Sequence, residues 1–166
     1  IGMIDACGNV YNFKYDKNGN NIRTELPDGS YATYKYDKLG RQIQVDDNMG
    51  LKTYNEFDSV GNLVSESNNE QQKNEYKYDA LGNVICEVDS MGRKTIYEYD
   101  GFGNLVKSKG YDGNETIYNY DEMDNLISYT DGEGKETICE YGTKGELLKA
   151  TDSEGRTSQY SYDVLG

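Results

Sequence analysis

The sequence predicts an all-β fold, a strip of antiparallel β-hairpins built from a 21-residue repeat. The first observation is the alternation of polar and apolar residues between turns, which has the period of a β-strand. The second is a turn sequence, Asp-x-x-Gly, that recurs along the chain. The third is an aromatic residue that returns every 21 residues without insertion or deletion, at Tyr15, Tyr36, Phe57, Tyr78, Tyr99, Tyr120, Tyr141 and Tyr162. Such regularity is typical of repeat architectures.

The composition is compatible with an ordered but thin structure. Hydrophobic residues make up 35% of the 166 residues, a value that by itself favours disorder. The 17 tyrosines argue against disorder, because they are β-formers with large apolar rings and recur in register. We therefore interpret residues 1–166 as a single array of about 7.5 repeats, cut within a repeat at both ends and with a modest core.

The net charge and the residue types that are missing exclude several classes of function. The formal net charge of -13 repels phosphate backbones and anionic membranes, so nucleic acid is not an expected partner. The absence of His removes Ser-His-Asp and Cys-His catalysis and the usual zinc ligand sets. No apolar run approaches the roughly 18 residues of a membrane-spanning helix, so we expect no membrane insertion. Cys7, Cys86 and Cys139 are too widely spaced for a disulfide framework, and Cys139 reads as a small core residue in place of an aromatic.

Each repeat is expected to contain two turns. The first follows the recurring aromatic residue and occupies Asp16–Gly19, Asp37–Gly40, Asp58–Gly61, Asp79–Gly82, Asp100–Gly103 and Asp163–Gly166, with deviating copies at Asp121–Asp124 and Gly142–Gly145. The second comes ten residues later, at Asp5–Gly8, Asp47–Gly50, Asp89–Gly92, Asp131–Gly134 and Asp152–Gly155. Leu26–Gly29 and Gly110–Gly113 are looser versions, and Asn68–Gln71 is the weakest turn because it lacks Gly.

The chemistry of Asp-x-x-Gly suits a short hairpin loop. An Asp at the first position can accept a hydrogen bond from the backbone two residues on. A Gly at the fourth position can take a positive φ without steric cost. These two features together close hairpin loops that are built on a type I turn.

The segments between turns are about six residues long, the usual length of a strand. Thr95, Tyr97 and Tyr99 share one face of their strand, while Ile96 and Glu98 point to the other. In the outgoing strand, the third residue after the turn is aliphatic at Ile22, Ile43, Val64, Ile85, Val106, Ile127 and Leu148. We place this aliphatic column beside the tyrosines on one buried face.

The opposite face becomes apolar along the chain. Polar Asn21 and Gln42 give way in later repeats to Leu63, Val84, Leu105, Leu126 and Leu147. Residues 80–150 are therefore expected to be partly apolar on both faces. No segment has a helical period, so we predict no helix of two turns or more. About 16 strands should form one continuous sheet, and the right-handed twist of a strip that long should coil it into a spiral.

The sequence Tyr-Asp-x-x-Gly-Asn/Arg at 21-residue spacing resembles the YD repeats of the Rhs (rearrangement hotspot) family. The residues that carry this resemblance are Tyr36, Asp37, Gly40, Tyr78, Asp79, Gly82, Tyr99, Asp100, Gly103, Tyr120, Asp121, Tyr162 and Asp163. The resemblance implies a structural scaffold, a segment of a hollow β-shell like those of bacterial polymorphic toxins, insecticidal toxin complexes and teneurins. It also implies the rest of the array and an enclosed C-terminal toxin domain as partners, and a secreted or cell-surface location. The self-cleavage motif of the family, Asp-Pro-x-Gly, has no match, because Pro27 follows Leu26.

Other classes of function compete with the scaffold. The alternative is carbohydrate or cell-surface binding through the tyrosine-lined repeats, although modules of that kind rely on Trp and this chain has none. The acidic turns at 112–115 and 131–134 resemble fragments of calcium loops, but each offers one or two carboxylates where calcium takes six to eight oxygens. We assign no enzyme activity, catalytic residue, cofactor or metal. An apolar strip along an open sheet is expected to promote self-association by faces or edges.

Overall fold

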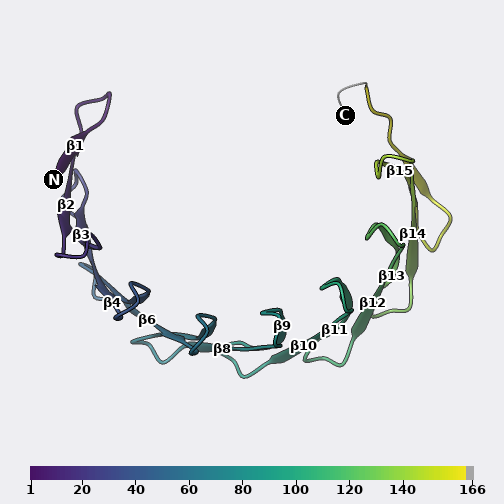
Figure 1. Cartoon of the computed structure of the whole chain (residues 1–166), viewed down its shortest axis with the longest axis horizontal. Coiled ribbons are helices and arrows are strands. Elements are labelled where there is room, and N and C mark those ends of the chain that lie inside the picture. Colours follow the sequence, from purple (N-terminus) through teal and green to yellow (C-terminus); the bar gives the residue numbers. More distant parts are fainter. Residues whose placement is uncertain (164–166) are drawn as a thin grey trace. The chain divides into compact units, whose positions relative to one another are not determined.

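The computed structural model describes residues 1–163 and contains strands and turns, with no helix in that range. The strand order in the sheet is the order in the sequence, from β1 to β16 (Figure 1). Each hairpin pairs antiparallel strands, as in the β1–β2 and β10–β11 pairs. The predicted all-β hairpin strip, its strand number and the lack of helices are confirmed.

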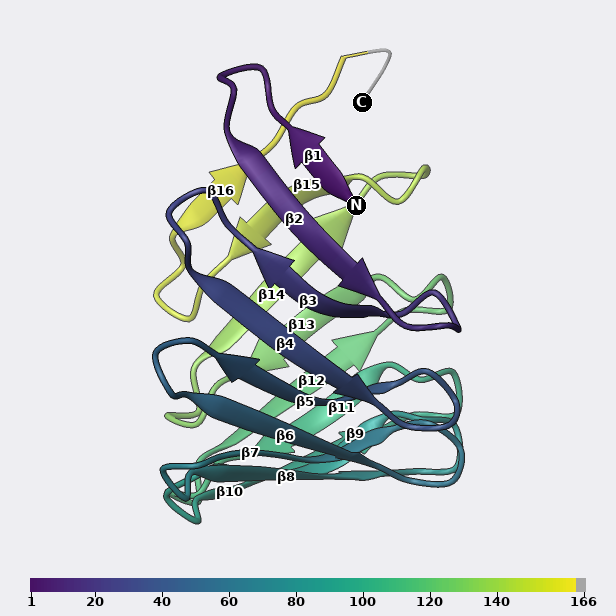
Figure 2. The same ribbon diagram turned by 90° about the vertical axis from the view of Figure 1, so that its left-hand side faces the viewer.

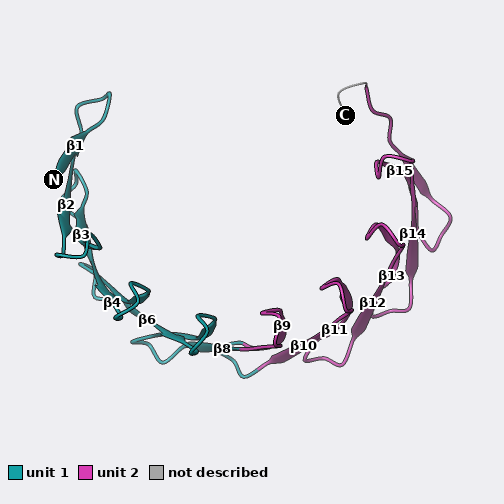
Figure 3. Cartoon of the chain, in the orientation of Figure 1, with its two compact units in different colours: residues 1–76, 89–92 teal, residues 77–88, 93–166 magenta. Residues whose placement is uncertain are grey.

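Contacts divide the chain into two compact units (Figure 3). The first unit comprises Ile1–Tyr76 and Asp89–Gly92. Its strands lie side by side with hairpin turns at both ends (Figure 2). They are β1 (Gly2–Ile4), β2 (Val10–Tyr15), β3 (Asn21–Glu25), β4 (Tyr31–Tyr36), β5 (Gln42–Asp47), β6 (Lys52–Phe57) and β7 (Leu63–Asn68), followed by the start of β8 (Lys73–Tyr78).

The second unit comprises Lys77–Val88 and the chain from Arg93 onward. Its strands are β9 (Val84–Val88), β10 (Lys94–Tyr99), β11 (Leu105–Lys109), β12 (Glu115–Tyr120), β13 (Leu126–Thr130), β14 (Glu136–Tyr141), β15 (Leu147–Thr151) and β16 (Thr157–Gln159). Most strands have five or six residues, the length that the spacing of the turns dictates.

A register shift marks every first-turn hairpin whose pairing is defined. In the β4–β5 hairpin, Lys35 is opposite Gln44 and Tyr36 is opposite Gln42, so Ile43 is the extra residue of a β-bulge. The shift recurs before Tyr15, Phe57, Tyr99, Tyr120 and Tyr141. The bulged residue is therefore a member of the aliphatic column, a feature that alternation in the sequence does not show.

The register places the aliphatic column on the tyrosine face. Tyr34 pairs with Val45, and Ile43 lies two residues away on the same side. Tyr97 pairs with Ser108, which shares its side with Val106. This part of the prediction is confirmed. A single-layer sheet has no second layer to cover the side chains on its faces, and this limits how far they can be buried.

The prediction that the tyrosine face is buried is wrong. The tyrosine face is at best half-buried, and Ile127 and Leu148 keep 38% and 40% of their surface exposed. Among residues 1–163, the buried residues are Ser65, Cys86 and Ser128, all on the opposite face. They share one position of the repeat, where a small side chain is covered by longer neighbours; Ser65, for example, lies between Glu56 and Glu75.

Apolar residues on that opposite face stay accessible to solvent. Ile96, Ile117 and Ile138 keep 36%, 45% and 48% of their surface exposed. They pair across the sheet with Cys86, Lys107 and Ser128. These isoleucines make the opposite face of the second unit partly apolar, as predicted. The leucine column predicted for that face is wrong: Leu105 pairs with Tyr99 and Leu126 pairs with Tyr120, so the bulge turns these leucines to the tyrosine face.

The third position of the first turn also projects an apolar side chain into solvent. We call these residues the turn ridge: Leu39, Val60, Leu81, Phe102 and Met123. Phe102 is 88% exposed and Val60 is 83% exposed. The part of the chain that the structure describes holds no helix that could cross a membrane.

Candidate functional site: the repeated turn and its tyrosine contact

Two backbone hydrogen bonds close the first turn of each repeat. In the copy at 100–103, the Asp100 N–H donates to the Asn104 carbonyl oxygen at 2.9 Å and the Gly103 N–H donates to the Asp100 carbonyl oxygen at 3.2 Å. Gly103 has a φ of 91°, in the left-handed region where a Cβ atom is strained. The same two bonds close the turns that begin at Asp16, Asp37, Asp58, Asp79, Asp121 and Gly142.

The Asp side chain closes the turn a second time. Asp100 Oδ1 accepts the backbone N–H groups of Phe102 and Asn104, both at 2.9 Å, and Oδ2 accepts the side-chain N–H of Asn104 at 3.1 Å. We call this arrangement the turn clasp: the Asp carboxylate together with the residue four positions later. It recurs at Asp16, Asp58, Asp79 and Asp121 with Asn, and at Asp37 with Arg41.

The clasp favours the ionised carboxylate. Hydrogen bonds from the backbone N–H of Asn104, and then from its side chain, hold the pKa of Asp100 below the ordinary value of 3.8. The pKa is lowered in the same direction at Asp16, Asp37, Asp58, Asp79 and Asp121. Partial burial opposes this shift of the pKa, and at Asp58 it is the largest single influence, outweighed only by the hydrogen bonds together.

Sequence reasoning assigned no role to the residue after the turn glycine. That residue is the donor of the clasp, and the signal was its recurrence as Asn20, Asn62, Asn83, Asn104 and Asn125. Of the expected signature residues, Asp37, Asp79, Asp100 and Asp121 all form the clasp, and Gly40, Gly82 and Gly103 all have positive φ. Asp163 is the last described residue, and the rest of its expected turn lies outside the described residues.

Turns that depart from the pattern keep the same backbone. Asp124 and Gln71 take the glycine position with φ of 62° and 67°, and Asp124 Oδ1 accepts the side-chain N–H of Asn104 at 2.8 Å. At the turn that begins with Gly142, the Glu146 carboxylate accepts the Lys144 N–H at 2.9 Å. A Cβ atom at Gly142 would clash with that carboxylate, so Glu146 occupies the space that Asp fills in other repeats.

The tyrosine before the turn bonds to the preceding strand. The Tyr120 hydroxyl on β12 donates to the Leu105 carbonyl oxygen on β11 at 3.0 Å. We call this contact the tyrosine staple. It recurs from Tyr36 to Asn21, from Tyr99 to Val84 and from Tyr162 to Leu147, at 2.8, 2.9 and 3.0 Å. Partial burial raises the pKa of Tyr36, Tyr99 and Tyr120 above the ordinary value of 10.0.

The staple satisfies a carbonyl that the strand ladder does not reach. The β11–β12 ladder pairs Lys107 with Ile117 and ends there toward the first turn, so Leu105 lies beyond it. A backbone carbonyl that is shielded from water needs a hydrogen-bond donor. The tyrosine hydroxyl supplies it and, in the four repeats where the bond forms, ties a hairpin to the one before.

One repeat makes the same bond with a different residue. Phe57 stands at the tyrosine position and has no hydroxyl. In that repeat the Asn55 side-chain N–H donates to the carbonyl oxygen of Gln42 at 3.2 Å, and Gln42 is the counterpart of Leu105. The acceptor is thus satisfied although the aromatic residue has changed.

The second turns of the first unit are joined by asparagine. Asn48 and Tyr31 exchange two bonds: the Asn48 N–H donates to the Tyr31 carbonyl oxygen at 3.0 Å, and the Tyr31 N–H donates to Asn48 Oδ1 at 3.2 Å. Asn69 and Lys52 repeat the exchange at 3.1 and 2.9 Å. The turns read as looser or weakest from the sequence, at 26–29, 110–113 and 68–71, have the same backbone hydrogen bonds as the others. The lower strength of the turn at 68–71 stays a prediction, and its Gln71 takes a φ of 67° where the other turns mostly have Gly.

The other candidates from the sequence lie apart from this arrangement. Cys7 is exposed, Cys86 is buried, and Cys139 is half-buried opposite Ala150. In the calcium-like turns, Asp131 accepts backbone N–H groups and Glu133 pairs with Lys135 at 2.5 Å. Within residues 1–163, no group of three or more His, Cys, Asp or Glu side chains is placed to hold a metal ion.

Repeated hairpins, the turn clasp and the tyrosine staple define an all-β repeat protein in which hydrogen bonds from side chains support the turns and link neighbouring hairpins. A family model described as RHS Repeat matches residues 15–50, 78–111 and 103–136, together more than half of the chain. The chain therefore belongs to the RHS repeat family. No curated protein sequence matches it significantly.

Solved structures share the fold at low sequence identity. A Tc holotoxin pore of Photorhabdus luminescens with a mutation in TccC3 is 16% identical with a TM-score of 0.74, over 87% of this chain and 9% of that one. TcdB2-TccC3 without its hypervariable C-terminal region is 14% identical with a TM-score of 0.72, over 98% of this chain and 12% of that one. The chain thus spans about a tenth of the length of the solved chains that it matches.

Proposed function

We propose that this chain is a structural scaffold segment of an RHS-repeat β-shell. The observation that carries the proposal is recurrence, because the same clasp forms in six first turns and the same staple recurs between hairpins. A catalytic centre is built once, whereas an arrangement present in each repeat serves the fold. The signature residues Tyr36, Tyr78, Tyr99, Tyr120 and Tyr162, with their Asp and Gly partners, are the proposed carriers of this role.

In the parent protein, the strip is proposed to coil and to enclose a C-terminal toxin domain outside the cytoplasm, either secreted or at the cell surface. The support is family membership together with the fold shared with chains of Tc toxin complexes. The strip coils in this proposal because strand twist accumulates along a long sheet.

Protease digestion of the full-length parent protein tests the enclosure. A segment C-terminal to the array should resist digestion, and should lose that protection when Asp79→Ala and Asp100→Ala open two clasps. Digestion of the segment at the same rate with and without the array would contradict enclosure. Fractionation of cells that make the parent protein tests the location, and recovery of all of it from the cytosol would contradict an exported shell.

Carbohydrate binding is the less supported function. The hydroxyls of Tyr36, Tyr99 and Tyr120 already donate to backbone carbonyls, so these donors are not offered to a sugar. Titration of cell-wall glycans against tyrosine fluorescence separates the two functions. No change in emission is expected for a scaffold, and a saturable change would favour glycan binding.

A further inference from the structure

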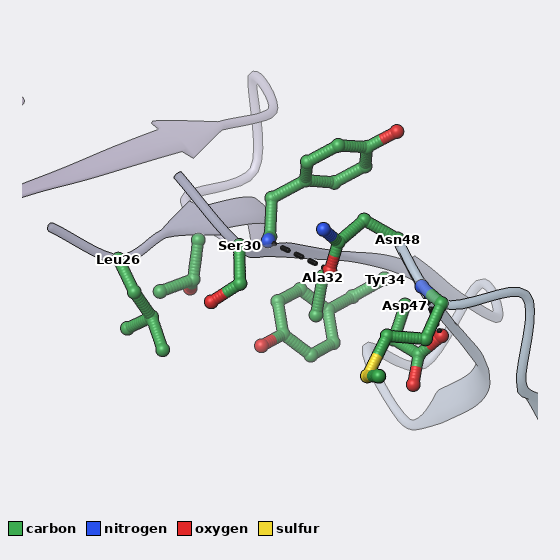
Figure 4. Close-up of a pocket in the computed structure, with 9 residues that line it drawn as sticks. Leu26, Ser30, Ala32, Tyr34, Asp47 and Asn48 are labelled. Atoms are coloured by element: carbon green, nitrogen blue, oxygen red, sulfur yellow. Dashed lines mark hydrogen bonds between the residues drawn. The ribbon is translucent and has the colours of Figure 1, made fainter. Parts of the chain in front are cut away.

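A cavity of about 280 Å³ lies on the tyrosine face of the first unit, beside the second turns at 26–29 and 47–50 (Figure 4). Ala32 and Tyr34 line it from β4, and Leu26, Asp47 and Met49 line it from the flanking turns and the end of β5. This volume is just below the roughly 300–1,000 Å³ of sites for drug-sized molecules, so it suits a smaller ligand.

The cavity lies where residue types depart from those of the other repeats. Ala32 is the smallest side chain at its position, which holds Tyr11, Thr53, Asn74, Thr95, Thr116, Thr137 and Ser158 in the other repeats. Leu26 replaces the usual first residue of the second turn, and Met49 is 90% exposed at the rim. Since the fold forms with other residues at these positions, their combination here is not a requirement of the fold.

The lining combines apolar walls with one available carboxylate oxygen. Asp47 Oδ1 accepts the N–H groups of Met49 and Leu51, both at 2.9 Å, whereas within residues 1–163 Oδ2 has no hydrogen-bond or ion-pair partner. No Lys or Arg is among the described residues that line the cavity. The Tyr34 ring adds an aromatic surface of the kind that attracts cations.

We propose that this cavity binds a small organic cation, an ammonium or guanidinium group on a short hydrocarbon or aromatic body. The apolar body would lie against Leu26, Ala32 and Met49, and the charged group would meet Asp47. Anionic ligands are disfavoured because the only charge in the lining is negative. The same chemistry is offered by a free amine and by a Lys or Arg side chain of a partner protein.

Nuclear magnetic resonance titration of the whole chain tests the proposal with three probes of equal length: n-butylammonium, n-butanol and butyrate. We expect saturable shifts of the Ala32, Tyr34 and Met49 amide signals with butylammonium only. Equal affinity for butanol, or shifts of these signals with butyrate, would overturn the proposal. The tripeptide Gly-Lys-Gly represents the partner side chain. Binding of either cation supports the site, and the ratio of the two affinities shows whether the ligand is a free amine or a side chain of a partner protein. If neither cation binds, the proposal is overturned.

Two variants and a matched control locate the effect. Ala32→Thr fills the cavity with a residue that four other repeats hold at this position, and should abolish binding while the chain stays folded. Asp47→Asn should weaken butylammonium binding by about fivefold, the scale of a solvent-accessible ion pair. Its turn should persist, because Asn68 accepts the equivalent N–H bonds at 3.0 and 3.1 Å.

Asp131→Asn is the control for Asp47→Asn. Asp131 has the same turn position and the same pair of backbone bonds in the second unit, and the substitution changes the net charge equally. Unchanged butylammonium binding is expected. An equal loss in both variants would show general attraction to an acidic protein and would overturn the site, as would unchanged binding in Ala32→Thr.

Discussion

The hydroxyl of Tyr120 donates a 3.0 Å hydrogen bond to the carbonyl oxygen of Leu105, a residue of the preceding strand that lies beyond the end of the β11–β12 ladder. An aromatic side chain on one hairpin thereby completes the backbone hydrogen bonding of the hairpin before it. The tyrosine of the repeat is therefore more than an apolar filler of the sheet face, and this has consequences that can be measured.

Removal of the staple hydroxyl should destabilise the chain. Tyr120→Phe keeps the ring but leaves the Leu105 carbonyl without its donor, and we expect unfolding in urea to show a loss of about 1 kcal/mol. Tyr118→Phe is the matched control, since its ring packs 6.4 Å from that of Tyr129 and its hydroxyl has no hydrogen bond within residues 1–163. Equal losses in the two variants would show that the staple contributes nothing specific.

The repeat with Phe57 allows a rescue experiment. Asn55→Ala removes the donor to the Gln42 carbonyl and should cost about 1 kcal/mol of unfolding free energy. Phe57→Tyr restores a hydroxyl at the position used by Tyr36 and Tyr99, and should recover most of that loss in the double variant. A double-mutant cycle measures the coupling, and additive effects would contradict a shared acceptor.

The glycine position of the turn should respond in both directions. Gly103→Val places a β-branched residue at a φ of 91° and should destabilise by roughly 1–3 kcal/mol. Gln71→Gly relieves a non-glycine residue at a φ of 67° and should stabilise by about 0.5–1 kcal/mol, after the added entropy of the unfolded chain is subtracted. Glu98→Gln on the exposed surface serves as the neutral control, and melting temperatures of the three variants decide the outcome.

The sequence predicts the fold of this chain unusually well because its repeats average out local ambiguity. The backbone preferences of Asp100 and Gly103 predict a turn, and the 21-residue spacing predicts the position of the next one. Alternation around Tyr97 and Tyr99 assigns the faces. These are local properties, and local properties are what a single sequence reports.

Relationships across strands were the part that the sequence did not reveal. The bulge at Ile43 depends on the pairing of Gln42 and Gln44 with another strand, and alternation along one strand carries no information about it. The burial of Ser65 depends on the length of its neighbours Glu56 and Glu75 rather than on its own polarity. In the repeat with Phe57, the donor is Asn55 in place of a tyrosine hydroxyl. This substitution can be recognised only when the acceptor, the Gln42 carbonyl oxygen, is known.

Acid should weaken the turn clasps. The pKa of Asp100 is lower in the folded chain than its ordinary value of 3.8, so the clasp stabilises the fold fully above that value and loses this contribution as pH falls through the folded pKa. The urea midpoint of the wild-type chain should therefore fall more steeply below about pH 4 than that of Asp100→Asn, which cannot titrate at this position. The decrease in net negative charge at low pH is nearly the same in both proteins and therefore cancels in the comparison. Parallel pH profiles would contradict a stabilising role of the ionised Asp100 carboxylate in the clasp.

The turn ridge should promote self-association. In the second unit, Leu81, Phe102 and Met123 are 74%, 88% and 67% exposed, each on a turn where a polar residue would serve the backbone equally well, as Asn18 does. Burial of apolar surface against a second copy is favourable at roughly 25 cal/mol per Å², whereas the net charge of -13 opposes association until salt screens it. Sedimentation velocity should therefore show a larger species that grows with concentration and ionic strength, and Phe102→Ser should reduce it. Asn18→Ser, at the same turn position, should leave the distribution unchanged. A monomer at every salt concentration, or equal association of the wild type and Phe102→Ser, would show that the ridge has no part in contacts between copies.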